Sequence, residues 1–324
     1  MKIGIMGAGA IAMKMAKTLN LMEEAQCYAV ASRSLEKAEK FAADNGVLKA
    51  YGSYEDMLKD QQVELVYIAT PHSHHYDCAK LCLAYRKPVL CEKAFMANAA
   101  QTREILDAFE KADLFITEAI WTRYLPSRRM IDEVVASGEL GEITFVTANL
   151  GADVQWKDRL QKPELAGGAL LDVGIYPLNF ISMVLGTEVE EITSSCTKTA
   201  SGVDEQNAVI LKFKNGAMAI AHSGMLSVTE QYGIVYGTKG YLIAEGVNNV
   251  QKLKVYDKAR QLKWERDVPE QLTGFEDEVR ASIKAIEEGK KECEEMPHKE
   301  TLRMMEMMDG LRRDWGVKFP FEEQ

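Results

Sequence analysis

A glycine-rich turn near the start of the chain has the residue types and spacing to bind phosphate. Residues 7–12 read G-A-G-A-I-A, the pattern G-x-G-x-x-A. An apolar run precedes this turn and apolar residues at spacings of three and four follow it, so we expect it to join a strand to a helix. Gly7 then allows a tight turn, Gly9 lets a pyrophosphate approach the backbone, and Ala12 keeps helix and strand close.

The helix that follows the turn supplies the binding groups. Its first N–H groups and the positive end of its dipole would face the phosphates. A tight turn that binds nothing is the simpler alternative, but the strand and helix context favours a dinucleotide. The residues expected to bind it here are Gly7, Ala8, Gly9, Ala10 and Ile11.

The end of the second expected strand indicates which dinucleotide binds. Sites for NAD usually carry an acid there that binds the ribose hydroxyls. Residues 31–34 read A-S-R-S, with no acid. Ser32 can donate a hydrogen bond to a 2′-phosphate and Arg33 can supply charge, so we expect NADP rather than NAD. The alternative is that Ser34 only caps a helix and Arg33 is merely solvated; the two roles are compatible.

Two further polar motifs follow expected strands of the same half. Residues 70–75 read T-P-H-S-H-H, and residues 91–94 read C-E-K-A. In a doubly wound sheet, ligands bind beyond the carboxyl ends of the strands. The additional residues expected near the cofactor are Thr70, Pro71, His72, His75, Glu92 and Lys93.

A metal site is the alternative for the histidine-rich motif. His72, His74, His75 and Cys78 are all possible zinc ligands. No second ligand pair follows at zinc-finger spacing, so we expect no metal. The six cysteines include no C-x-x-C pair, which favours free thiols over a disulfide scaffold.

The elements that position these motifs fall into two halves. Up to about residue 120, short apolar runs alternate with helical patterns, which indicates a parallel sheet with helices on both faces. After Arg123, strand-like segments follow one another with little helix between them, as in a mostly antiparallel sheet. The expected fold is therefore α/β, with a Rossmann domain over residues 1–120 and a second α/β domain with a large open sheet over residues 121–324.

Composition excludes several classes of protein. The chain has 324 residues, 47% of them hydrophobic, and a net charge of -10. A disordered chain is excluded, and the acidic balance argues against binding nucleic acid or an anionic membrane. No signal peptide and no stretch of about 18 apolar residues is evident. We expect a soluble, cytoplasmic protein.

Together these motifs resemble the Gfo/Idh/MocA oxidoreductases. The shared features are the G-x-G-x-x-A turn, T-P-H-x-x-H, E-K at residues 92–93, and G-G-A-L-L-D-V-G-I-Y at residues 167–176. The likeness is greatest to the branch of dimeric dihydrodiol dehydrogenases and NADP-dependent D-xylose dehydrogenases. It implies a homodimer, or a higher homo-oligomer, formed through the C-terminal sheet. The family's E-K-P is E-K-A here, with Ala94 in place of proline, and Tyr176 stands where many members have histidine.

The resemblance implies that Lys93 and Tyr176 are the catalytic pair. Hydride transfer at a carbinol carbon needs a group that moves the hydroxyl proton. A free tyrosine has a pKa near 10, and a neighbouring ammonium favours its phenolate. Asp172, four residues before Tyr176, is expected to bind a substrate hydroxyl or to tune the pair. The expected substrate-binding residues are Trp121, Arg123 and Arg159, whose ring and guanidinium groups suit a hydroxylated ring.

The expected activity is NADP-dependent oxidation or reduction of a sugar or a cyclic diol or polyol. A cofactor-binding sensor of the same fold, without turnover, is the main alternative. Such sensors tend to lose the catalytic lysine, whereas Lys93 and Tyr176 are both present. A methyltransferase is a second alternative, and it would carry an acid where Ser32 stands.

Overall fold

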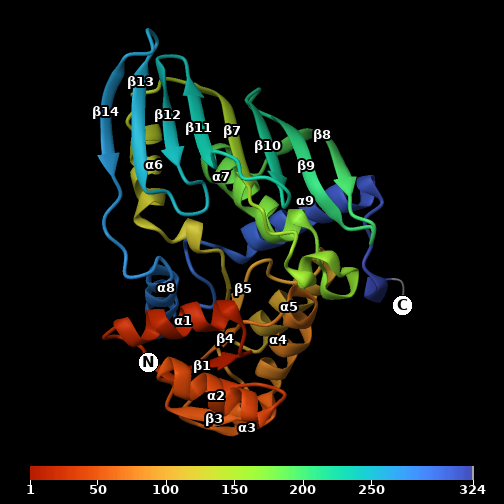
Figure 1. Ribbon diagram of the computed structural model, residues 1–324. Helices are drawn as coiled ribbons and strands as arrows, with labels where there is room; N and C mark the ends of the chain where they lie inside the picture. Colours follow the sequence, from red (N-terminus) through yellow and green to blue (C-terminus); the bar gives the residue numbers. More distant parts are fainter. Residues whose placement is uncertain (323–324) are drawn as a thin grey trace. The chain divides into compact units, whose positions relative to one another are not determined.

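The computed structural model describes residues 1–322, which divide into two compact units (Figure 1). The first unit contains residues 1–120 and 271–305, and the second contains residues 121–270 and the chain from residue 306. We expected residues 271–305 to lie in the second domain. They pack with the first unit because they cover its edge strand, where the Ile116 N–H donates a hydrogen bond to the Lys291 carbonyl oxygen at 3.0 Å.

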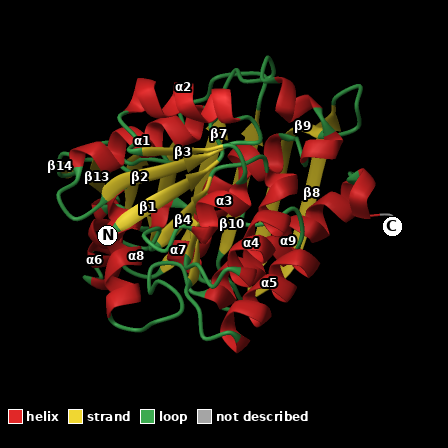
Figure 2. Cartoon of the chain, turned by 90° about the horizontal axis from the view of Figure 1, so that it is seen from below, coloured by secondary structure: helices red, strands yellow, loops and turns green. Residues whose placement is uncertain are grey.

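The first unit contains a six-stranded sheet in which every neighbouring pair is parallel, in the order β3-β2-β1-β4-β5-β6. This confirms the expected doubly wound parallel sheet. Figure 2 shows helices on both sides of it, with α1 and α2 on one side and α3 on the other. The strands are β1 (Lys2–Met6), β2 (Gln26–Ala31), β3 (Lys49–Tyr51), β4 (Leu65–Ile68), β5 (Val89–Glu92) and β6 (Ile116–Ala119). The helices are α1 (Ala10–Leu21), α2 (Leu35–Asn45), α3 (Tyr54–Lys59), α4 (His75–Ala84), α5 (Ala99–Lys111) and α8 (Glu276–Glu287).

Local signals determine where several of these helices begin. The side chains of Ser34, Ser53 and Asn98 each accept a hydrogen bond from the backbone N–H three residues later, as expected of N-caps. Helix α2 ends at Gly46, whose φ of 66° a glycine adopts without strain. Strand β3 was not predicted, because three residues give too short a pattern.

The second unit contains an eight-stranded sheet in the order β14-β13-β12-β11-β7-β10-β9-β8. Strands β7 and β10 pair in parallel, and the other neighbours pair antiparallel, so the sheet is mostly antiparallel as expected. The strands are β7 (Ile143–Gly151), β8 (Val189–Lys198), β9 (Asp204–Phe213), β10 (Met218–Gly224), β11 (Tyr232–Gly237), β12 (Gly240–Glu245), β13 (Lys252–Asp257) and β14 (Leu262–Asp267). The helices are α6 (Pro126–Ala136), α7 (Ile175–Leu185) and the last part of α9 (His298–Trp315), which begins in the first unit.

Helix α7 covers one face of this sheet. A Cβ added at Gly233 of β11 would lie 2.3 Å from the ring of Phe180, so helix and strand touch. An 18-residue window within Pro163–Leu185 has a mean hydropathy of 1.5, so this segment is long and apolar enough to cross a membrane, contrary to our expectation. Since 78% of that window is buried inside the fold, its apolar character fits a core helix.

Candidate active site

The glycine-rich turn has the geometry of a phosphate cradle. Gly7 has a φ of +115°, and a Cβ added there would lie 2.8 Å from the Ala69 carbonyl oxygen, so only glycine fits. A Cβ added at Gly9 would instead meet nothing within 4 Å. Gly9 thus leaves an open approach to the backbone, which a bound pyrophosphate can use.

Helix α1 completes this cradle. Gly9 is its N-cap and supplies no side-chain hydrogen bond, and its first turn contains no acidic residue. Backbone N–H groups at such an end favour an anion. Ala12 is fully buried, as expected for a residue that keeps helix and strand close. The turn therefore suits a dinucleotide phosphate.

The end of β2 presents a cation rather than an acid. Arg33 is exposed, and Ser32 is anchored by its N–H, which donates to the Tyr51 carbonyl oxygen at 3.1 Å. Ser34 caps α2, so the structural role considered for this residue is real. Burial lowers the pKa of His74, and the charge of Arg33 lowers it further.

His75, expected near the cofactor, lies between two loops of the first unit. Its ring is fully buried, with Nε2 2.8 Å from the carbonyl oxygen of Thr70 and Nδ1 3.0 Å from that of Ala94. Both nitrogens face backbone, so the ring tethers the loop after β4 to the loop after β5. Burial lowers its pKa, although these hydrogen bonds oppose the shift. Its neighbour His72 is also buried, edge-on to it at 5.8 Å.

The metal alternative gains no support from the described residues. No group of three His, Cys, Asp or Glu side chains within residues 1–322 is placed to hold an ion. Burial raises the pKa of the Cys78 thiol to about 11.

Lys93 follows β5 at a hydrogen-bonded junction. The Tyr67 hydroxyl donates to Oε1 of Glu92, and the Lys93 backbone N–H donates to Oε2 at 3.2 Å. Glu92 is buried, so its carboxylate does not reach into solvent and instead anchors the Lys93 backbone. The peptide bond between Lys93 and Ala94 is cis. Sequence reasoning did not single out Tyr67, which has no motif around it.

In the second unit, Asp172 and Tyr176 lie on one continuous helical segment. Leu170–Gly174 forms a single π-helical turn that leads into α7, and such turns are frequent at functional sites. Asp172 is buried and accepts a hydrogen bond from Nη2 of Arg159 at 2.9 Å. The structure thus brings Arg159, an expected substrate-binding residue, into contact with Asp172, an expected catalytic residue.

A buried carboxyl outside the expected set holds the start of this segment. Oδ2 of Asp204 accepts a hydrogen bond from the Leu170 N–H at 2.7 Å and another from Asn207 at 3.1 Å. Burial raises the pKa of Asp204 to about 6. No local pattern marks this residue, because its partner lies in another element.

Arg123, an expected substrate-binding residue, is held by hydrogen bonds to α7. It is buried, and its guanidinium donates hydrogen bonds to Asn179 at 2.6 Å and to Ser182 at 2.8 Å, both on α7. Trp121 lies in the same 3-10 turn, Trp121–Arg123, and is half-buried.

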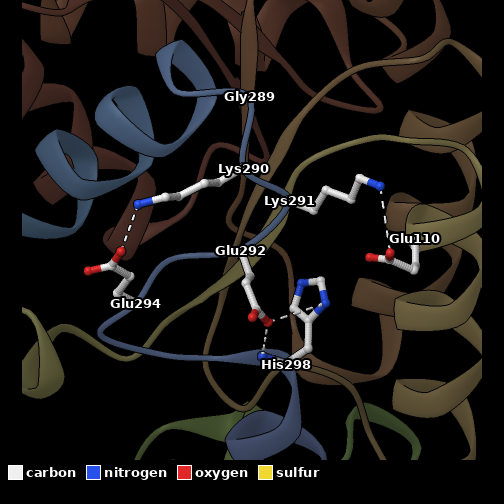
Figure 3. A pocket seen from close by; sticks show the side chains of 7 residues that line it. All are labelled: Glu110, Gly289, Lys290, Lys291, Glu292, Glu294 and His298. Carbon is white, nitrogen blue, oxygen red and sulfur yellow. Dashed lines mark hydrogen bonds and ion pairs between the residues drawn. The ribbon is translucent and has the colours of Figure 1, made fainter.

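A pocket of about 410 Å³ lies elsewhere in the first unit (Figure 3). Its lining comes from Glu110 and the segment 289–298, and includes none of the expected site residues. Lys290 pairs with Glu294 at 2.7 Å and Lys291 with Glu110 at 3.6 Å, so both ammonium groups are already neutralised. The pocket belongs to the segment that covers β6.

Two family models match the chain. Residues 1–119 match an oxidoreductase family with an NAD-binding Rossmann fold, and residues 129–243 match the GFO/IDH/MocA C-terminal domain. The chain belongs to the GFO/IDH/MocA family. The resemblance inferred from the motifs is thereby confirmed.

Curated relatives match over nearly the full chain. Trans-1,2-dihydrobenzene-1,2-diol dehydrogenase from Mus musculus is 33% identical, covering 99% of this chain and 98% of the relative. The enzyme of the same name from Bos taurus is 34% identical, covering 98% and 97%. With an NAD-binding Rossmann domain and relatives named dehydrogenases, this GFO/IDH/MocA protein is an oxidoreductase.

Solved structures share the fold at lower identity. KijD10, a 3-ketoreductase from Actinomadura kijaniata in complex with NADP and TDP-benzene, has a TM-score of 0.87 at 22% identity, covering 97% of each chain. Levoglucosan dehydrogenase in complex with NADH and levoglucosan has a TM-score of 0.88 at 16% identity, covering 99% of each. At these identities the likeness establishes the fold alone.

Proposed function

We propose that this oxidoreductase uses NADP to oxidise or reduce an alcohol–carbonyl centre on a sugar or a cyclic diol. The observation that carries the proposal is an open phosphate cradle at Gly9 in a chain that retains both Lys93 and Tyr176. The full-length relatives named dihydrodiol dehydrogenases support the diol class. The structural neighbours named for a 3-ketoreductase and for levoglucosan support the sugar class.

The preference for NADP rests on the end of β2. No acid stands there to bind ribose hydroxyls, and the exposed Arg33 offers a charge to a 2′-phosphate. The neighbouring structures carry NADP in one case and NADH in the other, so the fold admits both cofactors. The nucleotide would be held by the Gly7–Ile11 turn, with Ser32 and Arg33 at its adenosine end.

The chain's own residues would move the proton. Bound NADP supplies or accepts the hydride. Tyr176 takes the proton of the substrate hydroxyl in oxidation and returns it in reduction, and the Lys93 ammonium stabilises the phenolate and the developing oxyanion. Asp172, oriented by Arg159, binds a second hydroxyl of the substrate. Trp121 offers a flat apolar surface to the ring.

A second copy of the chain is the proposed partner. Successive residues of a strand point to opposite faces of the sheet. Val146 of β7 and Val235 of β11 pair with one another and are buried on the α7 side, so the residues next to them in the chain point away from α7. The face opposite α7 bears Phe145, Tyr236, Tyr241 and Tyr256, whose successive ring centroids lie 6.2, 6.0 and 4.9 Å apart. A broad apolar face of this kind favours burial against its own copy, and we propose a homodimer in the cytoplasm.

A substrate panel tests the proposed activity. NADP⁺ reduction is followed with aldoses, polyols and cyclic trans-diols, and the reverse reaction with the matching ketones. Turnover with one class supports the proposal and names the substrate. NADPH binding without turnover on any member would instead favour the cofactor-binding sensor.

A further inference from the structure

Helix α8 carries a carboxyl group into the interior of the first unit. Glu278 is 0% exposed, and within residues 1–322 neither of its carboxyl oxygens has a hydrogen-bond partner. Glu276, two residues earlier on the same helix, shows the contrast. Its carboxylate accepts hydrogen bonds from the backbone N–H groups of Leu272, Thr273 and Gly274. A buried carboxyl without donors is rare in folded proteins and calls for a role.

The charges that act on Glu278 within the described residues come from acids. Glu92 at the end of β5 repels its ionised form most, followed by Asp277 and Glu276 on α8, and the charge of Glu278 acts in turn on the Tyr67 hydroxyl of β4. Burial first, and repulsion by Glu92 next, raise the pKa of Glu278 well above its usual range. Because both carboxyl groups are buried and repel one another when ionised, we expect the two to retain one proton.

The hydrogen bonds decide which carboxyl keeps that proton. Glu92 accepts from the Tyr67 hydroxyl and from the Lys93 backbone N–H, and both bonds stabilise its ionised form. Glu278 has no such donor. The ionised group is therefore Glu92, and Glu278 is the neutral acid.

We propose that Glu278 is a positioning residue, which acts as a neutral carboxylic acid that leaves Glu92 ionised and bonded to Tyr67 and to the backbone of Lys93. If Glu278 lost its proton to solvent, its carboxylate and that of Glu92 would repel one another. This repulsion would weaken the hydrogen bonds of Glu92 and release the loop that carries Lys93. The positioning role rests on the first unit alone. Only its consequence for turnover rests on the proposed function.

Infrared spectroscopy tests the protonation state in the full-length protein. A protonated carboxyl gives a C=O stretch above the amide I band. We expect this band at pH 7 in the wild type, shifted by ¹³C-glutamate labelling and absent from Glu278→Gln. Glu287→Gln is the matched control, because Glu287 is an exposed residue of the same helix. Absence of the band from the wild type would overturn the proposal.

Hydrogen exchange tests the link to the Lys93 loop and needs no substrate. If opening of the loop lets Glu278 ionise, the protection factor of the Lys93 amide falls about tenfold per pH unit above the pKa of the solvated acid. We expect the protection factor to fall in this way in the wild type and in Glu287→Gln, and to stay independent of pH in Glu278→Gln. Glu278→Leu, which is also neutral, serves if the glutamine variant does not fold. The same slope in the wild type and the neutral variant contradicts the proposal.

Kinetics then connects positioning to turnover. We expect Glu278→Gln to keep kcat/KM within about twofold at pH 7 and to lose the decline that the wild type shows at higher pH. An unchanged pH profile in this variant argues against positioning. If no substrate is turned over by any form, the proposed function fails, whereas the infrared and exchange results still support or overturn the role of Glu278.

Discussion

The guanidinium of Arg159 donates a hydrogen bond to Asp172, with Nη2 and Oδ1 2.9 Å apart. The side chain of Asp172 is 8% exposed and that of Arg159 is 39% exposed. An ion pair with one half-exposed partner stabilises a fold by only about 0–1 kcal/mol. The main effect of this pair is therefore to orient the Asp172 carboxylate, on the segment that carries Tyr176.

The first prediction separates these two effects. We expect Arg159→Gln to change the free energy of unfolding by less than about 1 kcal/mol and to lower kcat/KM about tenfold, since about 1.4 kcal/mol of transition-state binding is lost. Urea denaturation and steady-state kinetics measure the two quantities. Lys162→Ala, which removes the neighbouring exposed pair with Asp158, should leave both unchanged. A large loss of stability with intact kinetics would make the pair structural.

The second prediction concerns Lys93 and Tyr176, which lie in different units of the chain. If both act on one hydroxyl, Lys93→Ala and Tyr176→Phe each lower kcat by about 10²- to 10⁴-fold. The double variant then loses little more than either single one, because groups that act together are not additive. A double-mutant cycle measures this coupling. Fully additive losses would show that the two residues act in separate steps.

The third prediction contrasts the two glycines of the phosphate cradle. Gly9 has a φ of −102°, and a side chain there points into open space. We expect Gly9→Val to leave the free energy of unfolding within about 1 kcal/mol while abolishing measurable cofactor binding, because the valine occupies the approach of the pyrophosphate. Fluorescence titration with NADPH measures binding.

Gly7 serves as the counterpart in the same turn. Its φ of +115° and the clash of a Cβ with Ala69 predict that Gly7→Ala destabilises the fold itself, by about 1–3 kcal/mol. If Gly9→Val binds NADPH as tightly as the wild type does, this turn is not part of the binding site.

The fourth prediction concerns the choice of cofactor. A charge-assisted hydrogen bond between Arg33 and a 2′-phosphate is worth about 1.5–3 kcal/mol, so Arg33→Asp should weaken NADPH binding by roughly 10- to 100-fold. NADH affinity should hold or rise. Parallel titrations with both cofactors measure the ratio. Arg260→Asp makes the same charge change on an exposed turn of the second unit and should leave the ratio alone. If the ratio of NADPH to NADH affinity is unaltered in Arg33→Asp, residues other than Arg33 bind the 2′-phosphate.

Much of the first unit could be predicted because its signals are local. The caps Ser34, Ser53 and Asn98, the turn at residues 7–12 and the apolar strands each depend on residues adjacent in the chain. The phosphate cradle could therefore be predicted from the sequence. The roles of Lys93 and Tyr176 came from the resemblance and stay predictions, since spacing alone says little about either.

What could not be predicted depends on partners distant in sequence. Arg123 was predicted to contact substrate, and nothing local showed that its guanidinium would be buried against Asn179 and Ser182 of α7. His75 belongs to a motif, but both of its ring nitrogens face backbone carbonyls of two loops. Glu278 sits in an acidic run typical of an exposed helix start, and only the packing of residues 271–305 on the first unit buries it.

The fifth prediction concerns the sheet face opposite α7. Ile234 of β11 lies on this face, opposite Thr147 of β7 and Ile243 of β12 in the ladder. A buried, unpaired charge at such a site is costly, so Ile234→Glu should convert a dimer to monomers while the monomer keeps its secondary structure. Val228→Glu places the same charge on a 73% exposed loop residue and should not alter the assembly.

Light scattering coupled to size-exclusion chromatography measures the mass of each form, and circular dichroism shows whether each is folded. A wild type that runs as a monomer at all concentrations contradicts the proposed dimer. A dimer that survives Ile234→Glu places the interface on another surface. Because the dimer buries apolar area, we also expect the wild type to lose stability on dilution below its dissociation constant, whereas Ile234→Glu should unfold independently of concentration.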